Sequence, residues 1–557
     1  MPNGGSPIRI LVLSNFYPPH HIGGYELRCR SVVDGLRRRG HHVHVLTSCH
    51  GVSAAGPPAR AVTRALHLAW GPPYPPEDLS GLLHCELADR RSLAATLRRT
   101  QPDVLDVWGM EFASQSLIAA LLCTGVPVHL TLEDLWLRDG YARDPLCALT
   151  AVARRLGVEM PPAVSRLCCL GLSRPQVNHA HVGLASRALQ DCYGAAGFGH
   201  PRCRVRLAGI DLSPFRSMPP PAAPPPFVIV SVGQLTAARG QADLIGAAAR
   251  VASDEDCPWP LVVRIVGGGS AAYVSTLRHL ATRHASHRFR TEFVGLLRPE
   301  RVADFYDGAH LFVHTSHLPE GLPRVLMEAM AAGLPAISTN TGGQRDILAD
   351  GRFGPLLPAG DPEALADAIR EALSNLPEWQ TRARQAREHA FEHYDIEAYV
   401  DGHLQDLTEA AAARPPVATP VLYADPPAAD EIAAFADSLG QAAETSAATF
   451  DVVADPDGAW RLGVVLKRTG QLPTADHLLT RLHETRRDDP THVRRATFHL
   501  GELTLVQQAW SRAADLLHAC LAVAPDHAKA AFDLRHAEQH RLPDHLAAIA
   551  QHPAVPA

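Results

Sequence analysis

The chain has 557 residues, 46% of them hydrophobic, which is enough for three or four domains with sizeable buried cores. A formal net charge of −6 gives no strong field of one sign, so charge alone does not indicate a nucleic-acid or acidic-membrane partner. The eleven cysteines form no CxxC pair, and we expect neither a metal nor a redox site. We recognise no signal peptide and no run of about 18 apolar residues. These features predict a cytoplasmic protein, with peripheral membrane contact left open.

The first three quarters of the chain alternate strand-like and helix-like patterns. Residues 8–13 predict a buried parallel strand, 26–39 a helix and 42–46 a second strand, the start of a doubly wound α/β sheet. The pattern restarts with strands at 227–232, 261–266, 311–313 and 336–338 and a helix at 241–251. We therefore predict two Rossmann-like domains, residues 1–215 and 227–410, joined by a proline-rich linker at 216–226.

Strand patterns stop after a second predicted linker, residues 411–430, and residues 431–557 predict an all-α domain. Leu462 and Gly463 recur as Leu500 and Gly501, and similar pairs recur at spacings of 35 to 39 residues. These spacings are close to the roughly 34-residue period of tetratricopeptide repeats, which this tail resembles. A generic helical bundle is the alternative. For a repeat array we expect a protein partner on the concave face.

The segment 317–335 carries the strongest chemical signal. Pro323 suits the first turn of a helix and Gly333 its end, so Glu320 falls in the preceding loop and Glu328 in the second turn. A carboxylate in a loop at the carboxyl edge of a parallel sheet stands where α/β folds bind ligands, and it can accept hydrogen bonds from sugar hydroxyls. If only the spacing of the two glutamates is considered, a role without chemistry explains them better: the helix dipole favours Glu320 near the N-terminus, and Glu328 is simply exposed to solvent.

The surrounding motifs reverse that judgement. The segment resembles the E-x7-E signature of family 4 retaining glycosyltransferases of the GT-B fold. Further motifs stand in the family's order, among them residues 17–26, 209–211, 266–270 and 342–343. The resemblance covers about residues 8–400 and implies two Rossmann-like domains facing a cleft. It also implies sugar transfer from a UDP- or GDP-linked donor with retention of configuration, and no cofactor. The acceptor, whether a glycan, a lipid-linked sugar or a small molecule, stays open.

The resemblance also implies the site residues. Glu320 contacts the transferred sugar and Glu328 the ribose of the donor. Arg239 can pair with phosphate, but Gln234 stands where the family carries a second cation, and Arg324 or Arg345 is the candidate replacement. The full set expected to bind the donor comprises Gly23, Gly24, Gln234, Arg239, Gly268, Glu320, Gly321, Leu322 and Glu328.

A second departure concerns the first domain. Glu133 stands where the family carries a histidine near the sugar, so the resemblance implies Glu320 and Glu133 as the catalytic residues. A carboxylate can bind a sugar hydroxyl, but it repels a diphosphate if the two are close. The alternative function is therefore a catalytically degenerate scaffold that binds a nucleotide sugar or glycan and recruits partners through its tail. Epimerisation or phosphorolysis on the same fold is a third possibility. We expect the acceptor-side segment 51–76 to be irregular.

Overall fold

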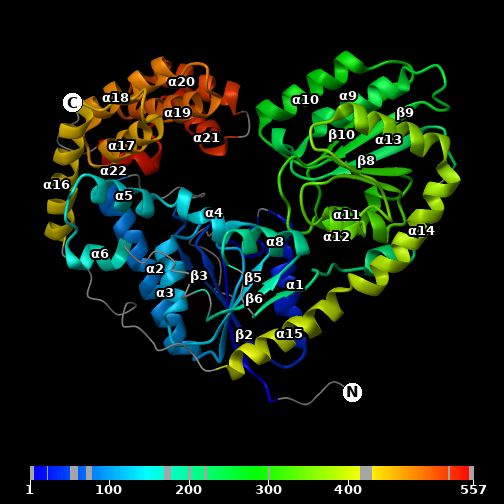
Figure 1. Cartoon of the computed structure of the whole chain (residues 1–557), viewed down its shortest axis with the longest axis horizontal. Helices are drawn as coiled ribbons and strands as arrows, with labels where there is room; N and C mark the ends of the chain where they lie inside the picture. The colour runs from blue at the N-terminus through cyan, green and yellow to red at the C-terminus, as the bar shows by residue number, and fades with distance from the viewer. Residues whose placement is uncertain are drawn as a thin grey trace.

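The structure is a computed structural model that describes residues 6–21, 23–50, 61–69, 78–168, 177, 179–198, 202–218, 223–298, 301–413, 429–524 and 527–550. Two α/β domains and a helical tail make up the molecule (Figure 1). Both predicted Rossmann-like domains and the predicted all-α region are therefore confirmed.

The first domain is built on a seven-stranded parallel sheet in the order β3-β2-β1-β4-β5-β6-β7. All residues of β1 after Arg9 are buried, as expected for a strand covered on both faces of its sheet. The segment 51–76 was expected to be irregular, yet β3 lies within it and pairs with β2. The strands are β1 (Arg9–Ser14), β2 (His42–Ser48), β3 (Val62–Leu66), β4 (Val104–Val107), β5 (Val128–Leu132), β6 (His181–Leu184) and β7 (Cys203–Val205).

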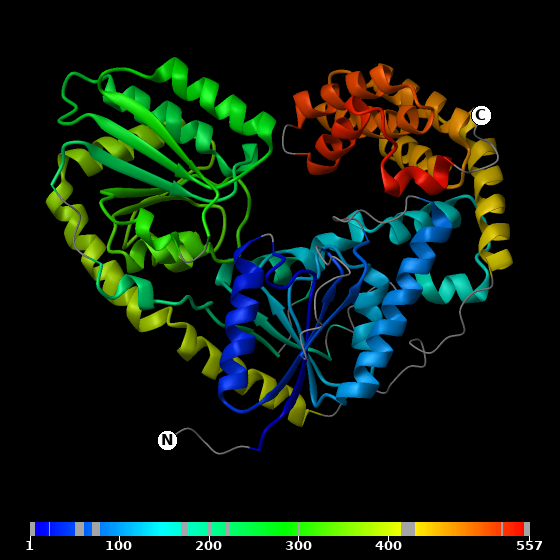
Figure 2. The same cartoon turned by 180° about the vertical axis from the view of Figure 1, so that it is seen from behind.

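Helices connect the strands of this sheet and pack beside it. Figure 2 shows α1 and α2 on the flanks of the strands. The helices are α1 (Gly24–Arg38), α2 (Leu79–Thr100), α3 (Gln115–Leu122), α4 (Trp136–Arg143), α5 (Pro145–Arg155), α6 (Pro162–Cys168) and α8 (Arg187–Ala195).

The second domain has a six-stranded parallel sheet in the order β10-β9-β8-β11-β12-β13. The predicted strands at 227–232 and 261–266 agree residue for residue with β8 and β9. The strands are β8 (Phe227–Val232), β9 (Leu261–Val266), β10 (Phe289–Gly295), β11 (Leu311–His314), β12 (Ala336–Thr339) and β13 (Leu356–Leu357). The helices are α9 (Gln241–Ala252), α10 (Ala271–His284), α11 (Arg324–Ala331), α12 (Gln344–Ile347), α13 (Pro362–Ser374) and α14 (Leu376–His393), with the 3-10 turn η2 (Ala237–Arg239).

Helix α15 (Ile396–Ala412) returns from the second domain to the first. It packs against α1, β4 and β5, and Arg39, which follows α1 directly, pairs with Glu397 at 2.9 Å and with Asp401 at 2.7 Å. Residues 396–410, predicted as part of the second domain, therefore lie on the first. The helix also takes up residues 411–412 of the predicted second linker, and 414–428 lie outside the described residues, as do 219–222 of the first linker.

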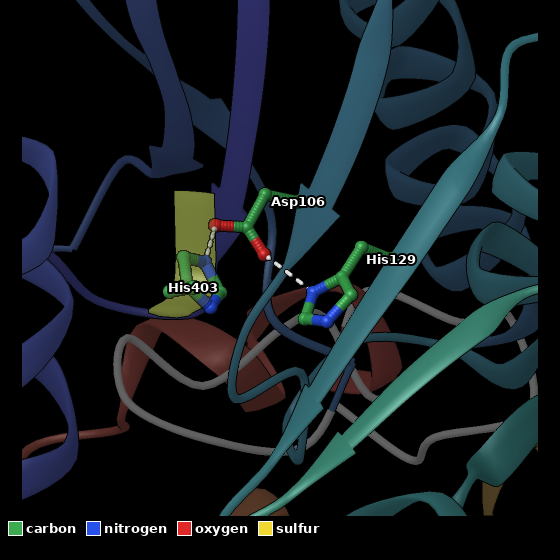
Figure 3. A group of neighbouring side chains, drawn as sticks. All are labelled: Asp106, His129 and His403. Carbon is green, nitrogen blue, oxygen red and sulfur yellow. Dashed lines mark hydrogen bonds and ion pairs between the residues drawn. The ribbon is translucent and has the colours of Figure 1, made fainter. Parts of the chain in front are cut away.

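A buried hydrogen-bond network fastens α15 to the first sheet (Figure 3). Asp106 of β4 lies between His129 of β5, at 3.2 Å, and His403 of α15, at 2.8 Å. Trp108 and Thr131 donate to the same carboxylate at 2.8 and 3.1 Å. Burial raises the pKa of Asp106, but the two histidines outweigh burial and hold this pKa below its usual range. Each carboxylate oxygen thus accepts two hydrogen bonds.

The tail consists of stacked helices that share a core with the first domain. Buried side chains of α16, α17 and α19 form one apolar cluster with residues of α2, α5 and α6, and Arg155 of α5 pairs with Asp455 at 2.8 Å. The elements are α16 (Ala429–Ala448), α17 (Pro456–Arg468), α18 (Leu472–Thr485), α19 (Pro490–Val506), α20 (Trp510–Val523), α21 (Ala528–Glu538), the 3-10 turn η6 (Asp544–Leu546) and α22 (Ala547–Ala550).

Two hairpins of the tail repeat one contact. A Cβ atom on Gly463 of α17 would lie 2.7 Å from Leu479 of α18, and one on Gly501 of α19 would lie 2.9 Å from Leu517 of α20. Glycine therefore lets the paired helices approach closely in both hairpins. The recurring Leu-Gly pairs of the sequence mark these two crossings, while the likeness to tetratricopeptide repeats stays a prediction.

Candidate functional site

The loops at the carboxyl ends of the second domain's central strands converge around Arg239. Arg239 closes η2, just after β8, and Gly240 follows it with a φ of +67°. A Cβ atom on Gly240 would overlap the carbonyl oxygen of Thr315, so only glycine allows this approach. The Thr315 hydroxyl also donates to the Arg239 carbonyl at 2.8 Å. These contacts hold Arg239 against the loop that follows β11.

Glu320 lies in that loop and is clamped by two basic groups. Its Oε1 atom is 2.6 Å from Arg239 Nη1 and 3.1 Å from His314 Nε2. The other ring nitrogen of His314 contacts the Ser338 hydroxyl at 3.2 Å. Burial raises the pKa of Glu320, but His314 and Arg239 together outweigh it and hold this pKa well below its usual range. The result is an ionised carboxylate beside a cation at the ligand-binding edge of the sheet.

The second glutamate of the signature is held on both of its oxygens. Glu328 lies in the second turn of α11, as predicted, and 7% of its side chain is exposed. Arg324 Nε pairs with Oε1 at 2.6 Å, and the Tyr306 hydroxyl donates to Oε2 at 3.0 Å. Pro323 precedes the helix rather than occupying its first turn, and Gly333 follows its end with a φ of +76°.

Arg324 reaches the first domain. A Cβ atom built on Gly24 would lie 3.4 Å from the Cδ atom of Arg324, so the arginine stem lies against the start of α1. Gly23 caps this helix, and its N–H donates to the Glu26 carboxylate at 2.9 Å. Gly24 therefore faces Arg324 across the domain junction, while the Gly23 amide is already bound to Glu26.

Gly321 and Leu322 lie in the contact between the domains. A Cβ atom on Gly321 would overlap the carbonyl oxygen of Glu133, and Leu322 is buried in a core cluster shared with the first domain. A Cβ atom on Gly343 would overlap the carbonyl oxygen of Gly321, and the Gly343 N–H donates to the Glu320 carbonyl at 2.9 Å. The loop carrying Glu320 is thus fixed between backbone segments of both domains.

Glu133 follows β5, but its carboxylate is turned into the first domain. It forms an ion pair with Arg28 of α1, and only 6% of the Glu133 and 3% of the Arg28 side chain is exposed. Arg28 also donates to the Gly209 carbonyl at 3.1 Å. From the sequence we expected the negative charge of Glu133 to repel a diphosphate. The ion pair with Arg28 compensates this charge. The geometry favours a positioning role for Glu133 over contact with a sugar.

The remaining predicted residues lie around this cluster. Gln234 is exposed, and its backbone carbonyl accepts a hydrogen bond from Gln241 at 3.0 Å. The carbonyl of Gly268, after β9, accepts from the Leu235 N–H at 2.8 Å and ties the two neighbouring loops together. Arg345 pairs with Asp350 at 3.1 Å and is 59% exposed. Of the two candidate replacement cations, Arg324 is therefore the one beside the glycine turn.

Sequence reasoning missed three contributors to this region. His314 contacts Glu320, and no sequence motif points to that contact. Tyr306 has no motif that points to it. Arg187 of α8 pairs across the domains with Asp346 of α12, whose side chain is 3% exposed. Such partners come from distant segments, and only the preference of a buried carboxylate for a cation could have suggested that they exist.

A cavity of about 420 Å³ lies beside this junction, between α8 and the loop after β12. Its charged groups pair with one another, since Arg187 also lies 3.5 Å from Asp350. The volume is in the range of small-molecule sites. The lining residues are Arg187, Ala188, Asp191, Asn340, Thr341, Gly342, Arg345, Asp346 and Asp350.

Two groups of potential metal ligands occur among the described residues. One is the Asp106 network of Figure 3, in which four hydrogen bonds already occupy the carboxylate. The other comprises Glu502, Asp533 and His545 in the tail. Neither lies among the loops around Glu320.

Two family models match the chain. Residues 22–166 match the model described as Glycosyltransferase Family 4, and residues 218–390 match the model described as Glycosyl transferases group 1. The two matches fall on the first and second α/β domains and leave the tail outside.

Curated relatives match part of the chain. A D-inositol 3-phosphate glycosyltransferase of Rhodococcus erythropolis is 30% identical over 41% of this chain and 52% of its own length. A second D-inositol 3-phosphate glycosyltransferase, from Catenulispora acidiphila, is 31% identical over 33% of this chain and 45% of its own length. Spore coat protein SA of Bacillus subtilis is 26% identical over 29% of this chain and 44% of its own length. The chain thus spans about half the length, or less, of the curated relatives it matches.

Solved structures match about three quarters of the chain. Sucrose-phosphate synthase of Thermosynechococcus elongatus superposes with a TM-score of 0.53 at 21% identity, covering 72% of this chain and 99% of that one. Anabaena HepE in complex with UDP superposes with a TM-score of 0.51 at 20% identity, covering 72% and 100%. At these identities the likeness establishes the fold. The chain therefore has two α/β domains of the GT-B fold, and each domain is similar to the glycosyltransferase family model that it matches.

Proposed function

We propose that the protein transfers a sugar from a nucleoside-diphosphate donor to a hydroxyl-bearing acceptor with retention of anomeric configuration. The observation that carries the proposal is the Arg239–Glu320–His314 cluster at the carboxyl edge of the second sheet. It sets an ionised carboxylate and a permanent cation side by side where an α/β fold binds its ligand. A glycosyl diphosphate can offer its sugar hydroxyls to the carboxylate of Glu320 and its negative charge to the guanidinium of Arg239.

The chemistry follows from where charge develops. When the bond between the sugar and the diphosphate breaks, negative charge grows on the leaving phosphate, and a cation fixed beside it lowers the barrier. Arg239 is already oriented by Glu320, so little reorganisation is needed. In the front-face mechanism that we propose for retention, the acceptor hydroxyl attacks from the face that the phosphate leaves, and a phosphate oxygen takes the acceptor's proton. Glu320 then accepts a hydrogen bond from the sugar and does not form a bond to it.

Arg324 supplies the second positive charge in this proposal. Its guanidinium pairs with Glu328, and its stem lies against Gly24 at the start of α1. The start of a helix carries partial positive charge and favours phosphate. Gln234 cannot provide a cation from the loop after β8, so Arg324 compensates from the first turn of α11. For phosphate to reach the α1 amides, Glu26 must release the Gly23 N–H.

Donor binding and turnover test the proposal separately. A thermal-shift screen of UDP, GDP and ADP and their glucose or mannose conjugates reports binding, because a ligand of the native state raises its stability. Nucleotide release from the best donor then reports turnover. We expect Glu320→Gln to lower the rate by roughly 10- to 100-fold, the cost of about 1.5–3 kcal/mol for a charged hydrogen bond.

A matched substitution controls for unspecific effects. Glu378→Gln on α14 changes a carboxylate that is 67% exposed, and it should leave both readouts unchanged. Unaltered turnover in the Glu320→Gln protein would refute the role of Glu320. Binding of a donor with no turnover in the unaltered protein, for all acceptors tried, would favour the scaffold alternative. If the folded protein binds none of the nucleotides, both the transferase proposal and the nucleotide-sugar scaffold alternative are refuted.

A further inference from the structure

A buried carboxylate of the second domain is bound by a residue of the first. One oxygen of Asp346 in α12 accepts the backbone N–H of Arg187 at 3.0 Å, and the other pairs with the Arg187 guanidinium. Only 3% of the Asp346 side chain is exposed, against 62% of the Arg187 side chain. Figure 1 shows α8 and α12 next to each other where the domains meet, and the two helices are in contact. The pair thus joins the domains through both oxygens of Asp346.

The start of α8 strengthens this contact. Ser186 caps the helix by accepting the Leu189 N–H at 3.2 Å. The first N–H groups of a helix have no partner within the helix and carry partial positive charge. Asp346 supplies an acceptor to one of them, the Arg187 N–H, from the other domain. Because a helix end and a guanidinium meet on one buried carboxylate, the contact should be stronger than an ion pair between two exposed side chains.

Arg187 also reaches the turn that follows α12. Its Nη2 atom lies 3.5 Å from the Asp350 carboxylate, which Arg345 contacts at 3.1 Å. Ala349 and Asp350 have φ angles of +47° and +53°, so the chain reverses tightly here. Arg187 therefore contacts both α12 and the turn after it, and it holds this segment of the second domain at two points.

The residues just before α12 lie directly against the loop that carries Glu320. The Gly343 N–H donates to the Glu320 carbonyl at 2.9 Å, and a Cβ atom on Gly342 would overlap the same carbonyl oxygen. On the first-domain side, a Cβ atom on Gly343 would lie 3.1 Å from the Cβ atom of Ser186. These two glycines are thus enclosed between the Glu320 backbone and the start of α8. A shift of α12 must therefore move the backbone of Glu320.

We propose that Arg187 is a positioning residue for Glu320. By binding Asp346 it fixes α12 and residues 342–343, and these hold the backbone of Glu320 in place beside Arg239. Glu320 is therefore set for reaction only while the two domains are in contact. A small misplacement of a group that contacts the reacting sugar slows the chemical step strongly. The effect on turnover rests on the proposed function, whereas the hold of the first domain on this loop does not.

Arg187→Met tests the inference, because it removes the guanidinium from a mostly exposed position and keeps the backbone N–H. Hydrogen exchange of a peptide that spans residues 341–347 should become at least about tenfold faster, since the Gly343 amide is held less firmly. Nucleotide release from the best donor should fall at least about tenfold, the worth of a charge-assisted hydrogen bond. Arg187→Lys keeps the positive charge and should recover part of both effects. Circular dichroism verifies that each protein is folded.

A matched control and a partner variant separate this role from unspecific effects. Arg370 of α13 pairs with Asp254 at 2.8 Å within the second domain, with both side chains 37% exposed, so Arg370→Gln should change neither readout. Asp346→Asn should act like Arg187→Met, and it replaces that variant if the latter does not fold. When the two substitutions are combined, nucleotide release should fall no further than in the more harmful single variant.

The outcomes distinguish this inference from the proposed function. Unchanged hydrogen exchange at residues 341–347 in the folded Arg187→Met protein overturns the inference, whether or not the protein transfers sugar. Faster exchange with unchanged nucleotide release overturns the positioning role and leaves the proposed function standing, as do effects of Arg187→Met and Asp346→Asn that multiply. If the unaltered protein binds a donor but releases no nucleotide, the proposed function is refuted, and hydrogen exchange alone decides whether Arg187 holds the loop.

Discussion

Substitution of Glu133 separates a structural from a catalytic role for this residue. Glu133→Gln removes the carboxylate that faces Arg28 and leaves the Arg28 guanidinium buried, with 3% of its side chain exposed. Breaking a buried ion pair on one side costs about 3–5 kcal/mol. For a domain of this size, that corresponds to a fall in melting temperature of roughly 6–20 °C. Scanning calorimetry of the full chain measures this fall in melting temperature, in the unfolding transition of the first domain.

The paired design isolates the cause. Arg28→Met with Glu133→Leu removes both charges and should recover most of the lost stability, because two apolar side chains need no counter-charge. Asp139→Asn breaks a pair with Arg138 in which both side chains are 36% exposed, and it should cost no more than about 1 kcal/mol. Nucleotide release per folded molecule, measured well below the transition, should change little in all of these proteins.

One outcome would refute this reasoning. If the Glu133→Gln protein melts like the unaltered chain but releases nucleotide far more slowly, the carboxylate acts on the substrate. The catalytic role implied by the sequence resemblance would then be correct, and the pairing with Arg28 would be incidental.

Three further predictions concern the domain junction. Arg324→Leu should weaken donor binding roughly 10- to 100-fold in calorimetry, and adding Gln234→Arg should recover at least part of it by restoring a cation near the phosphates. Gly321→Ala should lower nucleotide release and melting temperature, because its methyl group would overlap a first-domain carbonyl. Gly246→Ala in α9 adds its methyl group to open space, so it should leave nucleotide release unchanged and raise the melting temperature slightly, if at all. Burial raises the pKa of Asp134 to about 7, so the folded protein holds the proton of this carboxyl group more tightly than the unfolded chain does. The free energy that protonated Asp134 contributes to folding is therefore lost as pH rises from about 4 to 7. Asp134→Asn should therefore stabilise the protein in urea unfolding at pH 8 but hardly at pH 4.

Each of these has a contradicting result. No recovery by Gln234→Arg would place Arg324 outside the phosphate site. A Gly321→Ala protein as active and stable as the Gly246→Ala control would mean that the domains rest apart in solution. An equal effect of Asp134→Asn at both pH values would show that this carboxyl does not carry the raised pKa.

The sequence by itself determined the local elements and their order. Runs that are apolar but for Ser231 and Arg264 predicted β8 and β9 to the residue, because a strand covered on both faces of its sheet needs apolar side chains at nearly every position. Turn and cap chemistry placed Glu320 before α11 and Glu328 in its second turn. These properties depend on neighbours within a few residues, which a linear pattern records.

Only the tertiary structure decided which charges meet. Arg28 and Glu133 lie 105 residues apart in sequence, and Arg239 meets Glu320 through the register of two strands. The return of α15 to the first sheet likewise depends on Asp106, His129 and His403, which share no sequence motif. A buried carboxylate must find a partner, but nothing local says which one, because the distance between two side chains depends on how whole elements pack.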